Sequence, residues 1–172
     1  MNTFLELAKE RYSVRKFKDT PVEEEKIKMI LEAGRVAPTA RNNQPQKIYV
    51  ARSREALDKL NEISPCIYGA PLVFIVCYDL SRAARGNIRE NYQFGETDAA
   101  IVCTHMMLEA KDLGVGTCWV GMFNGEDVKK AFDLPEGIEP SALLPTGYPD
   151  EEFRPSDKHT AKREENDTIS YI

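Results

Sequence analysis

Apolar positions recur at helical spacing in several stretches of the chain. Thr3 and Glu6 have the spacing of a capping box and predict that the first helix begins there. Thr20, Pro21 and Glu23 predict an N-cap, a first-turn proline and a capping glutamate for the second helix. That helix carries a one-sided apolar stripe at positions i, i+3, i+4 and i+7, formed by Ile27, Ile30, Leu31 and Gly34. The pattern predicts helices at residues 3–11, 20–37, 53–63, 97–113 and 124–132.

Strands are predicted between these helices. The run PLVFIVCY at residues 71–78 is continuously apolar, which is typical of a strand covered on both faces. Shorter strands are predicted at residues 47–51, 115–121, 141–148 and 168–172. The polar stretch from residue 79 to 91 predicts a loop or an irregular helix. Because helices and strands intermingle without βαβ alternation, the pattern favours an α+β fold.

The predicted helix at residues 97–113 differs from the others because apolar and small residues lie nearly all round it. A helix without a solvent face is central in the fold or covered by a partner subunit.

Length and charge narrow the class of protein. A chain of 172 residues, 42% hydrophobic and 30% charged, predicts one folded domain over residues 1–172. The 23 basic and 28 acidic residues give a net charge of −5, which disfavours nucleic acid or a membrane surface as a partner. We find neither an apolar run of about 20 residues nor a secretory signal, and we expect a cytoplasmic protein.

The four cysteines, Cys66, Cys77, Cys103 and Cys118, stand at wide spacings. They form neither a CxxC pair nor a cluster with histidine, so the sequence predicts no metal site. Reduced, buried thiols are the expected state.

Arg11, Ser13 and Arg15 stand at alternate positions after the first helix. In an extended segment these side chains face the same way, and two guanidinium groups with a hydroxyl suit a phosphate. The chain has neither GxGxxG nor GxxxxGKS, so the two commonest phosphate loops are absent. Taken alone, the same triplet also fits a solvated basic face.

Two further stretches carry candidate chemistry. The loop PTARNNQPQ offers hydroxyl and amide groups that suit the edge of a heterocycle, although an ordinary turn has the same composition. The stretch GVGTCWVG has glycines that permit close approach of the backbone to a flat ligand. Trp119 within it stacks on a ligand or fills the core.

These motifs together resemble the nitroreductase family of FMN-dependent oxidoreductases. Residues 11–17 are similar to its opening R-x-S-x-R-x-F, and residues 38–45 to its P-S-x-x-N-x-Q-P loop. Further similarities follow in the family's order over nearly the whole chain, at Asp98, at residues 113–119 and 144–149, and at Arg163 with Ile169 and Tyr171. The resemblance implies a central, mostly antiparallel sheet flanked by helices, in an intertwined homodimer with FMN at the interface.

The resemblance also implies a role for each matching position. Arg11, Ser13 and Arg163 hold the FMN phosphate, and Arg15 lies near the pyrimidine edge of the flavin. The loop at residues 38–44 comes from the second subunit. The expected FMN contacts are Arg11, Tyr12, Ser13, Arg15, Pro38, Thr39, Ala40, Asn42, Gln44, Trp119, Val120, Gly121 and Arg163. No proton-transferring side chain is assigned as catalytic.

The implied activity is reduction of nitroaromatics, quinones or related small conjugated acceptors by NAD(P)H, in a ping-pong mechanism. Alternatives are a flavin-binding or storage protein with little turnover, flavin reduction, reductive dehalogenation, oxidation of a peptide heterocycle, and a dimeric interaction protein without cofactor. The chain departs from the family at Thr39, where serine is usual, and at Gln46, where a large residue is common. The chain is also short for the family, which predicts an open site.

Overall fold

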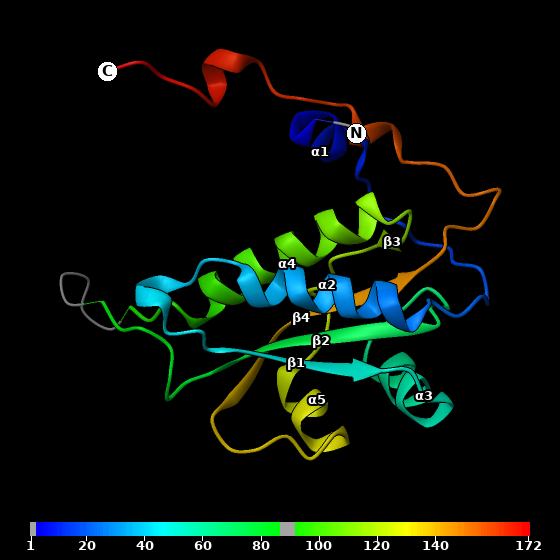
Figure 1. The fold of residues 1–172 in the computed structure, drawn as a ribbon, viewed down its shortest axis with the longest axis vertical. Coiled ribbons are helices and arrows are strands. Elements are labelled where there is room, and N and C mark those ends of the chain that lie inside the picture. Colours follow the sequence, from blue (N-terminus) through cyan, green and yellow to red (C-terminus); the bar gives the residue numbers. More distant parts are fainter. Residues whose placement is uncertain (1–2, 87–91) are drawn as a thin grey trace.

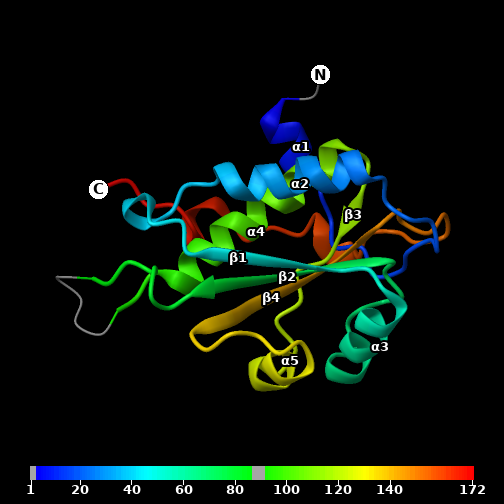
Figure 2. The same cartoon turned by 60° about the horizontal axis from the view of Figure 1, so that its bottom comes forward.

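The computed structural model describes residues 3–86 and 92–172. An antiparallel sheet in the order β1-β2-β4-β3 lies at the centre, with α2 and α4 on one face and α3 and α5 on the other (Figures 1 and 2). The strands are β1 (Gln46–Ala51), β2 (Leu72–Asp79), β3 (Gly116–Thr117) and β4 (Ile138–Gly147). The helices are α1 (Phe4–Glu10), α2 (Glu24–Val36), α3 (Arg54–Ile63), α4 (Gly95–Asp112) and α5 (Gly125–Ala131), with short 3-10 turns η1 (Ala40–Asn42), η2 (Asp157–His159) and η3 (Glu165–Asp167). The predicted α+β fold with an antiparallel sheet is confirmed.

β2 is covered on both faces, as its apolar run predicts. Successive side chains of a strand point to opposite faces of the sheet. Phe74 therefore lies in the core beneath α2 and α4, while Ile75 lies in the core against α3 and α5, and both are fully buried. The sheet is the shared wall of two apolar cores.

α4 is enclosed over most of its surface, also as predicted. Its exposed residues are Glu96, Thr97, Thr104 and Asp112, and all its other residues are buried or half-buried. The helix starts at Gly95, slightly before the predicted Thr97. Gly95 packs against Tyr78, where a Cβ atom would lie 2.3 Å from the ring carbon Cδ2, so a larger residue does not fit there.

The predicted N-cap at Thr20 is wrong. α2 begins after Glu23, and Glu23 makes no side-chain capping bond. Its carboxylate instead accepts a hydrogen bond from the Tyr148 hydroxyl and lies 3.8 Å from the ammonium of Lys26. Val22 is buried in the core beneath α2, and the preceding residues stay outside the helix to place it there.

Two predicted strands differ from the structure. Only Gly116 and Thr117 of residues 115–121 are paired as a strand, and Val120 returns to β4 through a bridge to Leu143. The strand predicted at 168–172 is wrong, because this tail pairs with no strand in the described chain and Tyr171 is 92% exposed. A strand needs a neighbour for its backbone groups, and β-forming composition does not supply one.

The stretch predicted as a loop or irregular helix at residues 79–91 is described only in part. Its first residues form turns in which Asp79 accepts from the backbone and hydroxyl of Ser81, and residues 87–91 lie outside the described residues. Among the described residues, no helix is both long enough and apolar enough to cross a bilayer.

Candidate functional site

The segment with Arg11, Ser13 and Arg15 is extended and lies against the sheet. The predicted capping box of α1 forms, and the chain leaves this helix at Arg11 in extended conformation. Ser13 then bridges Thr117 of β3 in parallel, and the Val14 N–H donates to the Thr117 carbonyl at 2.9 Å. Successive side chains of an extended segment point to opposite sides. Val14 is 1% exposed and points into the core, so the side chains before and after it face outward.

Gly116 allows this segment to lie close to β3. A Cβ atom built at Gly116 would lie 2.6 Å from Cγ2 of Val14 and 3.1 Å from Cγ of Pro149. Valine is stiff at its first side-chain torsion and has little room to give way. The glycine therefore fixes how near the cationic segment approaches the strand.

We expect Gly116→Ala to lower the free energy of unfolding by about 1–3 kcal/mol, because the added methyl overpacks the contact with Val14. Denaturant unfolding of the two proteins measures the difference. Gly125→Ala is the matched control, since a Cβ atom built there would lie 4.0 Å from Cδ of Pro140, an ordinary van der Waals contact. Equal stability of the Gly116 and Gly125 variants would contradict the role given to Gly116.

A cavity of about 830 Å³ opens beside the cationic segment. It lies between α1, residues 11–15 and the tail at residues 156–162. Its cationic lining side chains are Lys9, Arg11, Arg15, Lys158 and Lys162, and Ser13 adds a hydroxyl. Of the described residues that line it, none is acidic.

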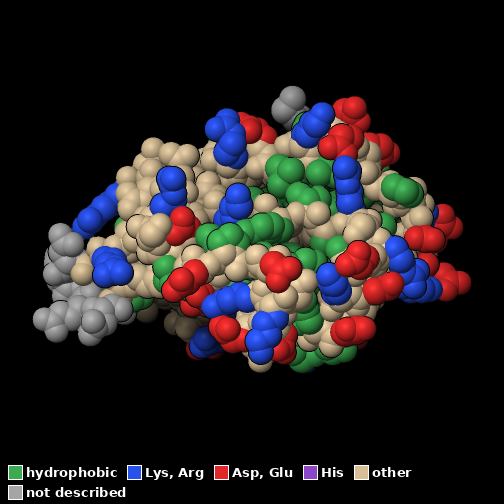
Figure 3. Space-filling view, turned by 90° about the horizontal axis from the view of Figure 1, so that it is seen from below, with side chains coloured by type: hydrophobic (Ala, Val, Ile, Leu, Met, Phe, Trp, Pro, Cys, Tyr) green, Lys and Arg blue, Asp and Glu red, His purple; other side chains and the backbone are tan. Residues whose placement is uncertain are grey.

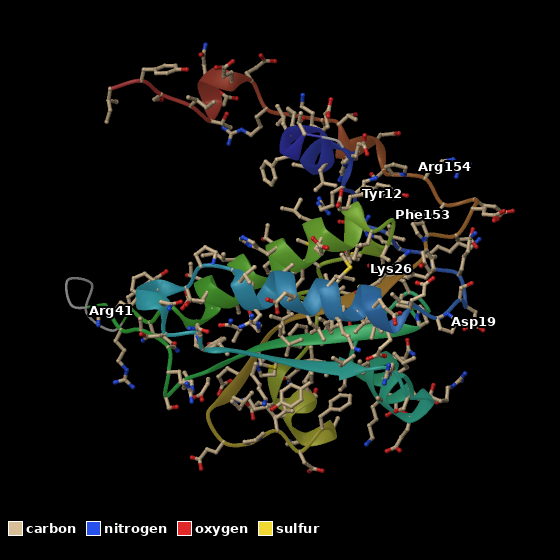
Figure 4. All side chains as sticks on the ribbon, in the orientation of Figure 1. Tyr12, Asp19, Lys26, Arg41, Phe153 and Arg154 are labelled. Atoms are coloured by element: carbon tan, nitrogen blue, oxygen red, sulfur yellow. The ribbon has the colours of Figure 1, made fainter. Side chains whose placement is uncertain are left out.

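Aromatic contacts hold the tail in place as the second wall of this cavity. Tyr12 stacks on Phe153 with ring centroids 6.2 Å apart, and it meets His159 edge-on at 6.0 Å. Figure 4 shows Tyr12 and Phe153 close together at the same end of the molecule. Tyr12 therefore stands at the cavity, with contacts that join the first segment to the tail.

The lysine and arginine side chains around the cavity differ from most others on the surface in having no carboxylate partner within the described chain. Lys16 and Lys18, just beyond the segment, pair with Asp150 at 3.1 Å and Glu151 at 2.7 Å. Lysine and arginine side chains are interspersed with acidic ones over the face in Figure 3. Within the described chain, the five cations of the cavity make no ion pair with a carboxylate: Lys9, Arg11, Arg15, Lys158 and Lys162. An anionic ligand can supply the missing counter-charge.

The stretch after β3 lies next to the same segment. Burial raises the pKa of the Cys118 thiol, while Arg15, Ser13 and Arg11 act in the opposite direction, which places these groups close together. Trp119 is half-buried against the core beneath α2 and α4, in line with the core role considered for its ring. Val120 exchanges two backbone hydrogen bonds with Leu143, at 2.9 and 3.0 Å. Gly121 is exposed, with open space where a Cβ would stand.

The loop at residues 38–44 lies at the other end of α4. Ala40 donates its N–H to Oδ1 of Asp98 at 2.8 Å, in the first turn of that helix, whereas β3 follows its last turn. The rise of 1.5 Å per residue from Asp98 to Asp112 separates the two places by about 20 Å. Figure 4 shows Arg41 and Tyr12 far apart, near opposite ends of α4. Within one chain, this loop does not join the cationic cavity.

The loop is nonetheless built with strain. Arg41, Asn42 and Gln44 have φ of 57°, 54° and 50°, in the left-handed region that non-glycine residues seldom adopt. The Gln44 N–H donates to Oγ1 of Thr39 at 3.0 Å, so the hydroxyl retained at Thr39 closes the loop. Pro38 precedes it on the surface, and Asn42 is exposed.

Asp98 anchors the loop by accepting the hydrogen bond from the Ala40 N–H. The residue is 1% exposed, and its second oxygen, Oδ2, has no hydrogen-bond partner in the described chain. Burial raises the pKa of this carboxyl above its usual 3.8, although the Ala40 N–H opposes the shift. Compared with the unfolded chain, the folded state therefore disfavours the charged form of Asp98, and stability is lost as the pH rises through the raised pKa.

We expect Asp98→Asn to remove this pH dependence. The stability of the unsubstituted protein relative to the variant should fall as the pH rises from about 3.5 to 7, because only the aspartate becomes charged. Urea unfolding at several pH values measures this difference. Asp127→Asn, at an exposed position on α5, is the control and should show a smaller slope. A flat difference for Asp98 would mean that its ionisation is not coupled to folding.

Arg163 is not brought to the cavity. It is exposed in the tail, where its guanidinium donates to the Asp167 carbonyl at 3.3 Å and lies 3.8 Å from the carboxylate. Neighbouring lysines of the tail, Lys158 and Lys162, line the cavity instead. Sequence reasoning missed these two and Lys9, because the tail mixes basic and acidic residues without a periodic pattern. No group of three or more metal-ligating side chains is found among the described residues.

A sequence profile of the Nitroreductase family matches residues 8–66 and 63–148. A candidate NADH dehydrogenase/NAD(P)H nitroreductase of Methanothermobacter thermautotrophicus is 35% identical over 154 residues, covering 86% of this chain and 78% of that protein. The chain belongs to the nitroreductase family. The resemblance of its motifs to this family is thereby confirmed.

Solved structures of the family support this assignment. A nitroreductase family protein of Clostridium difficile superposes with a TM-score of 0.91 at 36% identity, covering 99% of this chain and 98% of that one. A Desulfovibrio desulfuricans protein crystallised in complex with FMN has a TM-score of 0.81 at 23% identity, covering 100% and 98%, and shows the shared fold. The nitroreductase fold of the chain is confirmed, and the FMN contacts predicted for individual residues stay predictions.

Proposed function

We propose that this member of the family is a homodimeric, FMN-dependent oxidoreductase of the cytoplasm. It uses NAD(P)H to reduce nitroaromatics, quinones or related small conjugated acceptors. The observation that carries the proposal is the cavity lined by Arg11, Ser13 and Arg15, whose cations have no carboxylate partner in the described chain. The cysteines are all free thiols, which supports a reducing compartment.

The residues of the cavity fit the phosphate of FMN. A phosphate monoester carries about −1.5 to −2 charges at neutral pH and accepts hydrogen bonds through three oxygens. The Arg11 guanidinium and the Ser13 hydroxyl are the donors assigned to it, from a segment that pairs with Thr117 of β3. When bound, FMN supplies the chemistry that accepts a hydride from NAD(P)H and delivers electrons to the acceptor.

Arg15 has a different task in this proposal. Its side chain is exposed at the cavity and close to Cys118, next to the stretch with Trp119, Val120 and Gly121. A cation at that place lies near the pyrimidine edge of the flavin and favours the more negative, reduced state of the ring. Arg15 thereby orients and tunes the cofactor, and proton-transferring side chains are not required of this chain.

A second copy of the chain completes the site. The loop at residues 38–44 is too far from the cavity of its own chain to share a ring with it, so it would serve the cavity of the partner. Apolar side chains are exposed on α1, on α2 and in the tail, namely Phe4, Leu5, Met29, Val36, Ile169, Tyr171 and Ile172. A dimer interface is a natural place for such exposed apolar surface.

Steady-state kinetics test the proposed reaction. If NAD(P)H and the acceptor use one site in turn, double-reciprocal plots at several concentrations of a quinone or nitroaromatic will be parallel. Intersecting lines would contradict the ping-pong order. Oxidation of NAD(P)H that no acceptor accelerates would contradict the reductase function and favour a flavin-binding protein with little turnover.

Reduction of free flavin is the second candidate. It is favoured by the FMN reductase [NAD(P)H] of Bacillus subtilis, which is 27% identical over 166 residues, 87% of this chain and 67% of that protein. Turnover with added FMN as the preferred acceptor, above quinones and nitroaromatics, would select this activity.

A further inference from the structure

The turn that leads from α3 into β2 lies against the stretch that follows β3. Ser64 is fully buried in this turn, and its hydroxyl donates to the Met122 carbonyl at 2.8 Å. The Cys66 N–H donates in turn to the Ser64 hydroxyl oxygen at 3.2 Å. These two hydrogen bonds tie the turn to the stretch that the proposed function assigns to the flavin ring.

Tyr68 is held in this turn with a strained backbone. Its φ is 58°, in the left-handed region that bulky residues seldom adopt, and Gly69 follows with a φ of 69°. The half-buried ring of Tyr68 packs against two apolar clusters, one that contains Val14 and Ala70 and another that contains Cys118. Strain of this kind persists only where the surrounding contacts determine the conformation, and it is concentrated at functional sites.

The Tyr68 hydroxyl lies beside Arg15. A side-chain interaction with Cys66 and burial raise the pKa of this hydroxyl, whereas a side-chain interaction with the Arg15 guanidinium lowers it. The Arg15 guanidinium also donates to the Ser13 carbonyl, in a long hydrogen bond of 3.4 Å. Tyr68 is therefore a fixed neighbour of a guanidinium that is otherwise exposed.

We propose that Tyr68 is a positioning residue that holds the Arg15 guanidinium at the pyrimidine edge of FMN. The inference rests on the proposed function, in which Arg15 favours the reduced flavin. An exposed arginine has many rotamers, and its effect on a ligand is diluted when the charge moves among them.

The place of Tyr68 decides where the charge is held. A phenol oxygen accepts a hydrogen bond from a guanidinium N–H and so restricts Arg15 to few rotamers. Because the ring of Tyr68 packs beside Cys118, a guanidinium at its hydroxyl stays next to the stretch of Trp119, Val120 and Gly121. A charge fixed there before the flavin is reduced stabilises the reduced ring without reorganisation.

Potentiometric titration of the FMN-loaded protein tests this role. Tyr68→Phe removes the hydroxyl and keeps the ring that packs the turn. We expect reduced FMN to lose about five- to tenfold in affinity relative to oxidised FMN, which lowers the flavin potential. Arg15→Ala should lower the potential further, and the double variant should match Arg15→Ala, because the hydroxyl acts through the guanidinium. Tyr49→Phe, half-buried on β1 at the opposite edge of the sheet from β3, is the control and should keep the potential.

Nuclear magnetic resonance of the tyrosine rings tests the contact itself in the full chain without FMN. The Cζ signal of Tyr68 is the one that disappears in Tyr68→Phe. We expect Arg15→Ala to shift this signal and to leave that of Tyr49 in place, because the guanidinium lies at the Tyr68 hydroxyl.

Other results overturn the inference. A Tyr68 signal that Arg15→Ala does not shift means that the two groups do not meet. If Arg15→Ala lowers the potential and Tyr68→Phe does not, Tyr68 has no role at the flavin and the proposed function stands. An equal fall on Tyr68→Phe with and without Arg15 shows that the hydroxyl acts on the flavin by itself. If the protein binds no FMN, or Arg15→Ala keeps the potential, the role of Arg15 in the proposed function fails and this inference falls with it.

Discussion

Arg11→Ala is expected to weaken FMN binding by about 1.5–3 kcal/mol, roughly ten- to hundredfold in dissociation constant. Arg11 lines the cavity, has no carboxylate partner in the described chain and follows directly on α1. Its guanidinium is therefore available for a charge-assisted contact with phosphate, which the variant removes. Titration of the apoprotein with FMN, followed by quenching of flavin fluorescence, measures the change.

Arg54→Ala is the control for the loss of one positive charge. Arg54 is on α3, across the sheet from α4, and its side chain is 89% exposed and paired with Asp58. We expect its FMN affinity to match that of the unsubstituted protein. An unchanged affinity for Arg11→Ala, or an equal loss in both variants, would show that the phosphate does not bind at Arg11.

A heterodimer of two defective chains is expected to regain roughly half of the activity of the unsubstituted dimer. One chain carries Arg11→Ala, and the other carries Thr39→Ala with Asn42→Ala. If each site takes its cation from one chain and its loop from the partner, the heterodimer holds one intact site and one doubly defective site. Each defective homodimer alone should be nearly inactive at an FMN concentration that saturates the unsubstituted dimer but lies below the dissociation constants of the variants. Two affinity tags isolate the heterodimer for the assay.

A heterodimer that carries all the substitutions in one chain serves as the control, and it should not regain activity. When all three substitutions stand in one chain and the partner is unsubstituted, each site has one defective half, so this heterodimer should be nearly inactive. Activity in this second heterodimer, together with inactivity in the first, would mean that each chain builds its site alone. The pair of measurements thus decides where the loop at residues 38–44 acts.

The sequence predicted those parts of the fold that depend on local pattern. The continuous apolar run of β2 indicated a strand between two cores, and Thr3 with Glu6 indicated the capped start of α1. The phosphate hypothesis required an extended segment at Arg11, Ser13 and Arg15, and the structure has one there.

Other features depend on tertiary contacts, which a local sequence pattern does not predict. Thr20 has the composition of an N-cap, but burial of Val22 moves the start of α2 to Glu24. The tail at 168–172 has the composition of a strand and finds no partner strand in the described chain. Lys158 and Lys162 line the cavity in a tail whose His159 contacts the ring of Tyr12, far earlier in the sequence.

The absorption spectrum of the purified protein, recorded before and after anaerobic addition of NADPH, tests the central claim most directly. The account predicts the bands of oxidised flavin at one FMN per chain, either as isolated or after incubation with FMN, and their bleaching by the nucleotide. A protein that stays colourless after incubation with FMN, or bound flavin that neither NADPH nor NADH bleaches, would contradict it.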